Sequence, residues 1–276
     1  MYKSQSAMEY LMTYGWAILI IAVVLGVLFQ LGVFSGSALT PKAAPGACQV
    51  VRLGGQMSLE GECQGQLPQY VGQFEGGSAL INIPYSSSLG SVNTLTVAFW
   101  INQNAVSNIN YENILYFGGA SVLSAQAKFD SSNNEWMGFP GQVLGFTPIK
   151  PGEWGFMTGT DNGVYCSVFE NGTLLPSTVF PCSTAYYTSG TSYIGGTSVF
   201  YGELSNVQLY NSSLSLNEIR ALYLEGIGGA PIKIQNLVGW WPLNGNGNDY
   251  SGNNNNGQIA GNVLFNGTWQ SGYTPP

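Results

Sequence analysis

The sequence predicts a mainly β protein, a two-sheet antiparallel jelly-roll sandwich carried on an N-terminal α-helix of membrane-spanning length. Three observations support this prediction. An uncharged apolar run occupies residues 11–34, apolar and polar residues alternate with a period of two in the later part of the chain, and glycine and asparagine separate the alternating segments. Many short strands closed by such turns are typical of sandwiches and jelly rolls.

The apolar run Leu11–Phe34 contains 24 residues and no charge. At about 1.5 Å rise per residue it reaches roughly 36 Å as a helix, which is enough to cross a hydrocarbon core of about 30 Å. The apolar core of a secretory signal is shorter, at about 7 to 15 residues, and follows a basic segment, whereas here only Lys3 is basic. The run therefore predicts a transmembrane helix.

The string from Gln5 to Ala17 resembles the class III signal peptide of archaeal type IV pilin-like precursors. In that family a peptidase cuts before the glutamine and leaves the helix on the mature protein. The resemblance implies a leader of residues 1–4, a cut between Ser4 and Gln5, and a pilin-like helix of residues 5–34. Ser4 departs from the family, which usually has glycine before the cut.

Glu9 is the one carboxylate at the edge of this apolar run. A charge beside lipid is costly unless it is compensated, and cleavage would create an ammonium at Gln5 that can pair with it. Pairing between neighbouring chains would set the axial register of a filament. The alternative is an uncleaved signal anchor whose Glu9 lies among lipid headgroups. Bacterial tight-adherence pilins share the pair Glu9-Tyr10, so this pair does not decide the kingdom.

Composition excludes several classes of function. Only 8% of the residues are charged and the net charge is −7, so there is no cationic footprint for nucleic acid. The chain has no histidine, which excludes histidine-dependent triads, imidazole bases and histidine metal ligands. The abundant glycine, asparagine, serine and tyrosine indicate a polar but weakly ionic surface.

The four cysteines predict two disulfides in an exported protein, with three connectivities open. Pairing Cys48 with Cys63 and Cys166 with Cys182 closes short loops, each worth about 3 kcal/mol in the chain-entropy model. A zinc site of four thiolates is the alternative, but no C-x-x-C spacing supports it. Three sequons also predict surface glycosylation, although such short patterns arise by chance. They begin at Asn171, Asn211 and Asn266.

A tether of small residues and two prolines, residues 35–47, separates the helix from a predicted head of residues 48–276. Strands in the head are predicted from alternating residues, of which one set faces inward. The inward sets are Ala79, Ile81 and Ile83; Leu95, Val97, Phe99 and Ile101; Val164, Cys166 and Val168; and Ser205, Val207 and Leu209.

Two local signals lie between these strands. Glu170-Asn171-Gly172-Thr173 predicts a hairpin turn. Ser215-Leu216-Asn217-Glu218 is a capping box that begins a helix, and Gly226 ends it. The apolar stripe of this helix is Leu216, Ile219, Leu222 and Tyr223.

An ordered series of motifs between Gln73 and Gly226 resembles the laminin G-like, concanavalin A-like lectin and glucanase superfamily. The series is Phe74-Glu75-Gly76, Ile81-Asn82-Ile83-Pro84, Phe99-Trp100-Ile101, Gly152-Glu153-Trp154, Asn171-Gly172, Tyr193-Ile194-Gly195 and the strand from Gly202 to Tyr210. The resemblance implies an antiparallel jelly roll of the kind used for sugar binding, adhesion and some glycoside hydrolysis.

The motif Gly239-Trp240-Trp241-Pro242-Leu243, followed by Asp249, usually opens domains of this superfamily but comes last here. Circular permutation explains the order, because the first and last strands of such a sandwich are adjacent and termini are usually close. The alternative is a second, truncated copy.

Calcium is the ion that the sequence favours. Asp249, Asn248 and Asn246 supply hard oxygen ligands, although too few carboxylates for high affinity. Asp130 with Asn133, Asn134 and Glu135 forms a second oxygen-rich loop. For both loops the alternative is a plain Asx-rich turn. No cofactor is required.

The sequence predicts that the protein is not an enzyme. The E-x-D-x-x-E strand of laminarinase-type relatives is absent, and the acidic pair Glu60 and Glu62 lies before the sandwich, where a solvated loop is the simpler interpretation. Aromatic rings beside amides instead form platforms for sugar faces. Trp100 and Trp154 are predicted to lie inside, and either Trp240 or Trp241 to point outward.

These features predict a cell-surface adhesin or pilin-like subunit with an extracellular, lectin-like head that binds glycan or a surface protein. Its membrane contact is the N-terminal helix, which could also assemble copies into a pilus. Two alternatives remain open: a purely structural pilus subunit, and a divergent glycoside hydrolase.

Overall fold

The computed structural model describes residues 7–30, 41–89, 94–103, 112–117, 123–127, 135–139, 142–147, 150–175, 179–181, 190, 192–196 and 200–276. The chain divides into two compact units at Pro41, and we call residues 42–276 the head. Residues 42–47, expected in the tether, therefore belong to the head. Several predicted residues lie outside the described ones: Ser4, Gln5, Asp130, Asn133, Asn134 and Cys182.

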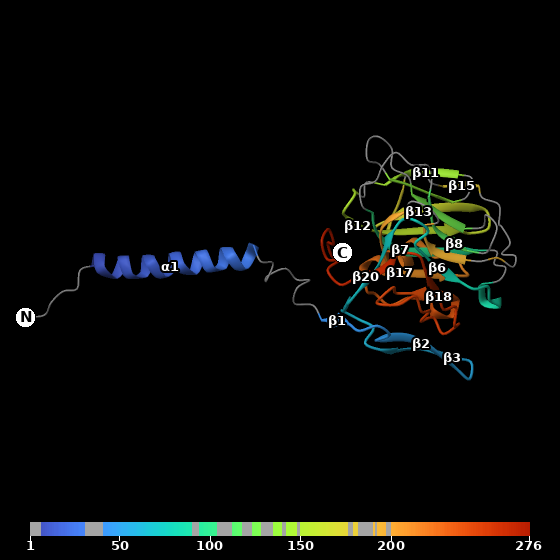
Figure 1. Ribbon diagram of the computed structural model, residues 1–276, viewed down its shortest axis with the longest axis horizontal. Coiled ribbons are helices and arrows are strands. Elements are labelled where there is room, and N and C mark those ends of the chain that lie inside the picture. The colour runs from blue at the N-terminus through green and yellow to red at the C-terminus, as the bar shows by residue number, and fades with distance from the viewer. Residues whose placement is uncertain are drawn as a thin grey trace, which may run out of the picture. The chain divides into compact units, whose positions relative to one another are not determined.

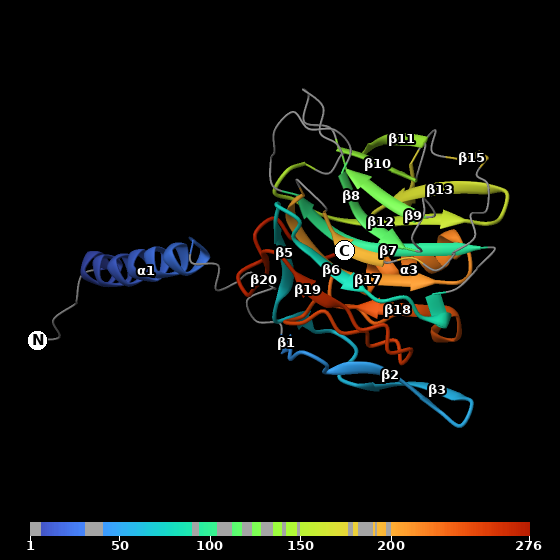
Figure 2. The ribbon, with the colours of Figure 1, turned by 45° about the vertical axis from the view of Figure 1, so that its right-hand side comes forward.

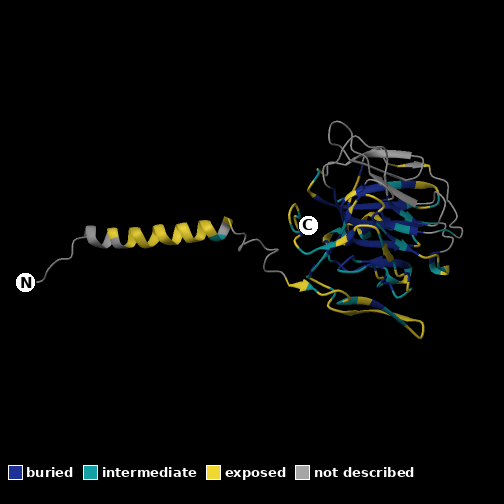
Figure 3. Cartoon of the chain, viewed as in Figure 1, coloured by how far each residue is buried: buried dark blue, intermediate teal, exposed yellow. Residues whose placement is uncertain are grey.

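The N-terminal unit contains helix α1, Ala7–Gln30, so the predicted helix is confirmed over these residues (Figure 1). Its residues 14–27 are all exposed, which leaves apolar side chains on every side of the helix (Figure 3). The side chain of Glu9 is not among the described parts. No helix in the described part of the chain is long and apolar enough to span a membrane.

In the part of the head that the structure describes, the large sheet has nine antiparallel strands. Seven follow one another in the order β14 (Thr173–Leu174), β13 (Tyr165–Glu170), β12 (Trp154–Asp161), β7 (Leu95–Gln103), β17 (Tyr201–Tyr210), β5 (Val71–Glu75) and β20 (Val263–Asn266). Two more pair beside this row, β18 (Leu237–Trp241) with β17 and β15 (Phe180–Pro181) with β13.

The small sheet has five strands in the order β19 (Gln258–Ala260), β6 (Leu80–Ile83), β16 (Ser192–Gly195), β8 (Glu112–Phe117) and β9 (Leu123–Ala127). The described residues also form three two-stranded pairs (Figure 2): β1 (Lys42–Ala43) with β4 (Leu67–Pro68), β2 (Cys48–Leu53) with β3 (Gln56–Gly61), and β10 (Glu135–Phe139) with β11 (Gln142–Thr147). Short 3-10 turns lie at Ser87–Leu89 and Ile234–Asn236 (η2).

The two sheets enclose the main core, so the antiparallel sandwich predicted from the alternation is confirmed. The predicted inward faces of β6 and β7 are buried in this core, with Ile81 and Ile83 on one sheet and Val97, Phe99 and Ile101 on the other. Apolar burial on this scale is the main stabilising term in such a domain.

Two of the predicted inward residues face elsewhere. Ser205 lies opposite Trp100 on the outer face of the large sheet, because the register shifts between Ser205 and Gln208, where Asn206 has a φ of 52°. Val164 precedes β13 and is exposed, since Asn162 Oδ1 accepts the N–H of Val164 and holds the chain in an Asx turn. The hairpin predicted after β13 is confirmed by the pair Glu170–Thr173.

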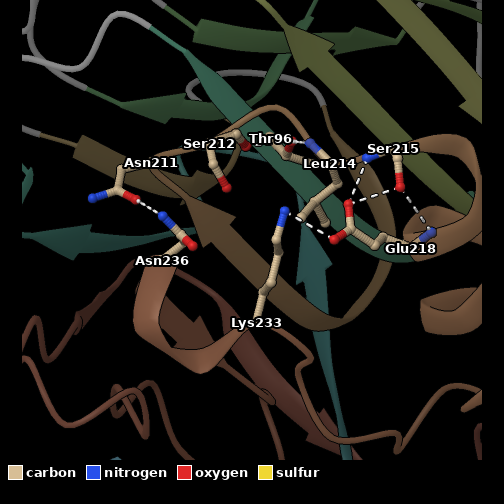
Figure 4. Close-up of polar contacts among 8 residues, drawn as sticks. All are labelled: Thr96, Asn211, Ser212, Leu214, Ser215, Glu218, Lys233 and Asn236. Carbon is tan, nitrogen blue, oxygen red and sulfur yellow. Dashed lines mark hydrogen bonds and ion pairs between the residues drawn. The ribbon is translucent and has the colours of Figure 1, made fainter.

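Helix α3, Leu216–Leu224, confirms the predicted capping box. The Glu218 carboxylate accepts the N–H of Ser215 at 2.7 Å, and the Glu218 N–H donates to Ser215 Oγ (Figure 4). The ammonium of Lys233 lies 2.8 Å from Glu218 Oε1, and this contact, with the Ser215 hydrogen bonds, lowers the pKa of Glu218. Ile219 and Leu222 are buried, but Leu216, predicted in the stripe, is exposed.

The C-terminal segment is an integral part of the sandwich. Strand β18 pairs with β17 in the large sheet, β20 pairs with β5, and β19 pairs with β6 in the small sheet. The segment therefore contributes strands to both sheets, as circular permutation predicts and as a spare truncated copy would not.

Candidate functional site

A sandwich offers two outer faces, and in this head the outer face of the large sheet is covered. Trp100 on β7 stacks against Tyr223 of α3, with ring centroids 5.9 Å apart, and meets the edge of Tyr273 at 5.5 Å. Trp154 packs on Trp269, and its indole N–H donates to the Trp269 carbonyl at 3.0 Å. The predictions that Trp100 and Trp154 lie inside are confirmed, at 1% and 7% exposure.

The outer face of the small sheet carries a different set of side chains. Cross-strand register places Gln258, Asn82, Tyr193 and Tyr116 in one row across β19, β6, β16 and β8. The rings of Tyr116 and Tyr193 stack with centroids 5.0 Å apart and planes 14° from parallel. Gln258 is exposed and the other three are half-buried. We call these four residues the tyrosine platform.

Period-two alternation produces the platform. Ile81 and Ile83 flank Asn82 and point into the core, as do Ile194 beside Tyr193 and Leu115 beside Tyr116. The residues between them must therefore face outward. The platform has aromatic faces, amide donors and acceptors and no formal charge, which are the groups that bind the apolar faces and hydroxyls of sugars.

Neither of the adjacent tryptophans on β18 contributes to a surface. Trp240 and Trp241 point to opposite faces, as expected for a strand, but they are 3% and 0% exposed. The Trp240 indole donates to Asn206 Oδ1 at 2.8 Å, and the Trp241 indole donates to the Asn255 carbonyl at 2.9 Å. The prediction that one of them points outward is wrong, because both faces of β18 are covered.

The predicted calcium loop is held together by its own hydrogen bonds. Asp249 Oδ1 accepts the N–H groups of Trp240 and Ser251, and Oδ2 accepts the Ser251 hydroxyl and the Asn255 N–H, all within 2.8–2.9 Å. Asn246 Oδ1 accepts the Asn248 N–H at 3.0 Å. Among the described residues no three acidic, cysteine or histidine side chains cluster as metal ligands. A cation at Asp249 would have to displace one of its four donors.

Two buried glutamates lie on opposite faces of the large sheet. Glu170 is opposite Met157 on the core side, and its Oε2 has no hydrogen-bond partner among the residues that the structure describes; burial raises its pKa to about 7. Glu203 lies opposite Asn102 on the α3 side and accepts the Asn266 amide at 2.5 Å. Burial raises the pKa of Glu203, and the Asn266 hydrogen bond partly offsets this. These two carboxyl groups cannot flank one glycosidic bond.

The predicted local disulfide between Cys48 and Cys63 is confirmed, with Cα atoms 5.0 Å apart. Cys166 is also disulfide-bonded, and its predicted partner Cys182 lies outside the described residues. These bonds rule out a zinc site that uses all four thiolates.

The three sequon asparagines differ in their surroundings. Asn266 donates its amide to buried Glu203, and Asn171 Oδ1 accepts the Phe156 N–H at 2.9 Å. Asn211 is exposed, and its Oδ1 accepts the Asn236 amide, which leaves Nδ2 turned away from that contact (Figure 4). Asn211 is therefore the sequon best placed for attachment of a glycan.

Residues 75–220, more than half of the chain, match the concanavalin A-like lectin/glucanases superfamily. The chain belongs to this superfamily. The match falls within the segment from Gln73 to Gly226 that carried the resemblance in the sequence, so that prediction is confirmed. It covers β6, β7 and β16 but ends before β18, β19 and β20. Among curated protein sequences none matches the chain.

Solved structures similar to the chain share its fold at low sequence identity. A proposed carbohydrate-binding protein from Bacteroides ovatus is 15% identical with a TM-score of 0.56, and the match covers 78% of this chain and 64% of that one. The heptameric SAP-like pentraxin of Limulus polyphemus is 15% identical with a TM-score of 0.52, covering 71% of this chain and 94% of the pentraxin. This chain thus spans just under two thirds of the Bacteroides protein.

Proposed function

We propose that the head binds neutral carbohydrate on the tyrosine platform. The observation that carries this proposal is the stacked pair Tyr116–Tyr193, half-buried and flanked by Asn82 on the outer face of the small sheet. Superfamily membership and the likeness to the Bacteroides protein support it at the level of fold. Because the platform carries no charge, a neutral sugar fits it better than an acidic one.

The positions of the acidic side chains favour carbohydrate binding over glycoside hydrolysis. A glycosidase needs two carboxyl groups about 5–9.5 Å apart across the scissile bond. Glu170 and Glu203 lie on opposite faces of the large sheet, and no acid belongs to the tyrosine platform. The acidic pair Glu60 and Glu62, expected in a solvated loop, lies on and just after the exposed strand β3. We therefore propose a non-enzymatic, adhesive role without a required calcium ion.

We further propose that α1 anchors the head at the cell surface as a pilin-like stem, cut between Ser4 and Gln5. A helix that is apolar on all sides needs a covering of lipid or of other helices, and residues 14–27 of α1 are exposed along their whole length. Pairing of Glu9 with the new amine at Gln5 is part of the same proposal. N-terminal sequencing that finds Met1 on the mature chain would contradict it.

Glycan-array binding tests the carbohydrate proposal. The full chain in mild detergent is expected to bind neutral glycans, and Tyr193→Ala to weaken binding about tenfold or more, since truncation of a hot-spot residue costs about 2 kcal/mol or more and tenfold corresponds to about 1.4 kcal/mol. Tyr165→Ala, which removes a 46% exposed tyrosine from β13, is the matched control and should bind normally. Wild-type protein that binds no glycan would leave the structural pilus subunit as the better account.

A further inference from the structure

The hairpin of β2 and β3 exposes an edge that is built to accept another strand. In Figures 1 and 2, β3 is the outer strand of the hairpin, and all six residues of β3 are exposed. Among the described residues β3 pairs with β2 alone, in an unbroken six-residue register. Natural edge strands usually avoid pairing through charged side chains, proline or a bulge, and β3, with the sequence QMSLEG, has only Glu60 among these devices.

The open backbone groups on this edge include those of Met57 and Leu59. Gly54 and Gly55 form a two-residue turn with positive φ angles, so the closing pair Leu53–Gln56 exchanges its hydrogen bonds. Hydrogen-bonded and non-hydrogen-bonded pairs alternate along an antiparallel ladder. The N–H and C=O groups of Met57 and Leu59 therefore point away from β2.

The side chains of the same two residues form a partly exposed apolar strip, in which Met57 Sδ accepts a hydrogen bond from Arg52 Nη1 at 3.1 Å. They lie opposite Arg52 and Val50, on the face of the hairpin that is turned toward the rest of the head. Val50 is buried, and Arg52 donates to the carbonyls of Ser251, Ile234 and Leu237 at 2.8–3.1 Å, so β2 is fixed to the head. Met57 and Leu59 remain 40% and 37% exposed because β3 extends past this contact.

A groove of about 590 Å³ lies between Leu59 and residues 230–235. Ile232 and Ile234 line its far side. That side is held by the ion pair of Lys233 with Glu218 and by the hydrogen bond of Asn236 to Asn211 (Figure 4). A strand added to β3 would thus meet unpaired backbone groups along the edge and apolar side chains beneath it.

We propose that the occupant of this edge is β3 of a second copy, paired antiparallel about a two-fold axis at Ser58. In this register the backbone N–H and C=O of Met57 form hydrogen bonds with those of Leu59 in the second copy. By symmetry, Leu59 of the first copy pairs in the same way with Met57 of the second. Two-fold pairing of this kind is the commonest way in which identical chains associate. The two apolar strips then lie side by side over both grooves.

The chemistry of β3 favours a second copy because the strand is complementary to itself. Apolar Met57 is opposite apolar Leu59 twice, Gln56 is opposite Glu60, and no like charges meet. A register centred on Leu59 would place Met57 opposite Gly61 and lose half of the apolar pairing. The inference concerns self-association and does not rest on carbohydrate binding.

Disulfide cross-linking tests both the interface and its register, in the full chain in mild detergent. Ser58 would face Ser58 in a non-hydrogen-bonded pair, with Cα atoms about 4.5 Å apart, inside the range of about 4.4–6.8 Å for a disulfide. Ser58→Cys is expected to form covalent dimers in at least about tenfold higher yield than Gln56→Cys or Glu60→Cys alone. A mixture of the last two variants should form the mixed dimer.

Two outcomes would overturn the proposal. If Ser58→Cys forms no more covalent dimer than Gln56→Cys, the chains contact one another at random within the micelle. If a mixture of Gln56→Cys and Glu60→Cys forms no mixed dimer, a second measurement leads to the same conclusion. Preferential cross-linking of Leu59→Cys would refute the register. Tyr193→Ala should leave the Ser58→Cys yield unchanged, which separates this interface from the tyrosine platform.

Discussion

The two outer faces of the sandwich differ in how far their aromatic side chains are buried. On the large sheet, Trp100 and Trp154 are covered by Tyr223, Trp269 and Tyr273, so the aromatic rings there belong to a second core. On the small sheet, Tyr116 and Tyr193 stack only half-buried beside Asn82. An aromatic residue thus contributes to a buried core on one face and to the proposed binding site on the other, and what covers the face decides which.

Deleting residues 237–276 is the most severe test of this contrast. The deletion removes β18, β19 and β20 from both sheets together with buried Trp241 and Trp269. We expect the loss of cooperative unfolding, which is measured by thermal denaturation followed by near-ultraviolet circular dichroism. A truncated chain that still unfolds in one sharp transition would show that the segment is dispensable.

Trp100→Ala probes the covered face with a single side chain. Removing a fully buried tryptophan commonly costs about 3–5 kcal/mol, and Trp100 contacts Phe156, Tyr223 and Tyr273. Urea denaturation should show this loss. A loss below about 1 kcal/mol would mean that the large sheet does not depend on its cover.

Glu170→Gln sharpens the account of the core between the sheets. The pKa of Glu170 is raised by burial from 4.5 to about 7, so between these pH values the unfolded chain ionises while the folded chain does not. Wild-type stability should therefore fall as pH rises from about 4.5 to 7, by up to about 3 kcal/mol before solvent screening reduces it. Urea midpoints across this range should decline less in Glu170→Gln. Parallel declines would contradict the buried, neutral carboxyl.

Tyr193→Ala should separate recognition from stability. Its stacked ring contact is worth about 0.5–1.5 kcal/mol, so folding should weaken by about that amount while the loss of glycan binding is larger. The comparison uses denaturation and array binding on the same sample. Equal binding by the variant and by wild type would remove the platform from the proposed site.

Ser215→Ala has the smallest expected effect on stability. It weakens helix α3, which covers the outer face of the large sheet, without removing an aromatic ring. Loss of the N-cap should cost about 1 kcal/mol, because the Glu218 N–H loses its partner at the start of α3. Thermal denaturation should detect this, and glycan binding on the opposite face should not change. Weaker binding in this variant would link the two faces.

Much of the fold follows from local patterns in the sequence. Alternation predicted the inward faces of β6 and β7, and the capping box predicted α3, because each depends on neighbours within a few residues. Ser205 was misplaced since a bulge at Asn206 depends on how β17 pairs with β7. Trp240 and Trp241 were misjudged for a related reason, because distant segments cover β18.

The candidate site was less accessible to sequence reasoning. Tyr193 lay in a recognisable motif, but its stacking partner Tyr116 is far away in the chain, and only the register of β16 with β8 brings the rings together. The Asp249 loop shows a different difficulty, and its calcium site stays a prediction. Its oxygen-rich composition suggested calcium, yet four internal donors already use that carboxylate.

Hydroxyl-radical footprinting tests the central claim most directly. Oxidation of each tyrosine is measured by mass spectrometry in the full chain, with and without the neutral glycan that binds best on the array. The account predicts that glycan protects Tyr116 and Tyr193, while exposed Tyr165 and Tyr201 on the large sheet react as before. Protection of Tyr165 or Tyr201, with Tyr116 and Tyr193 unchanged, would contradict it.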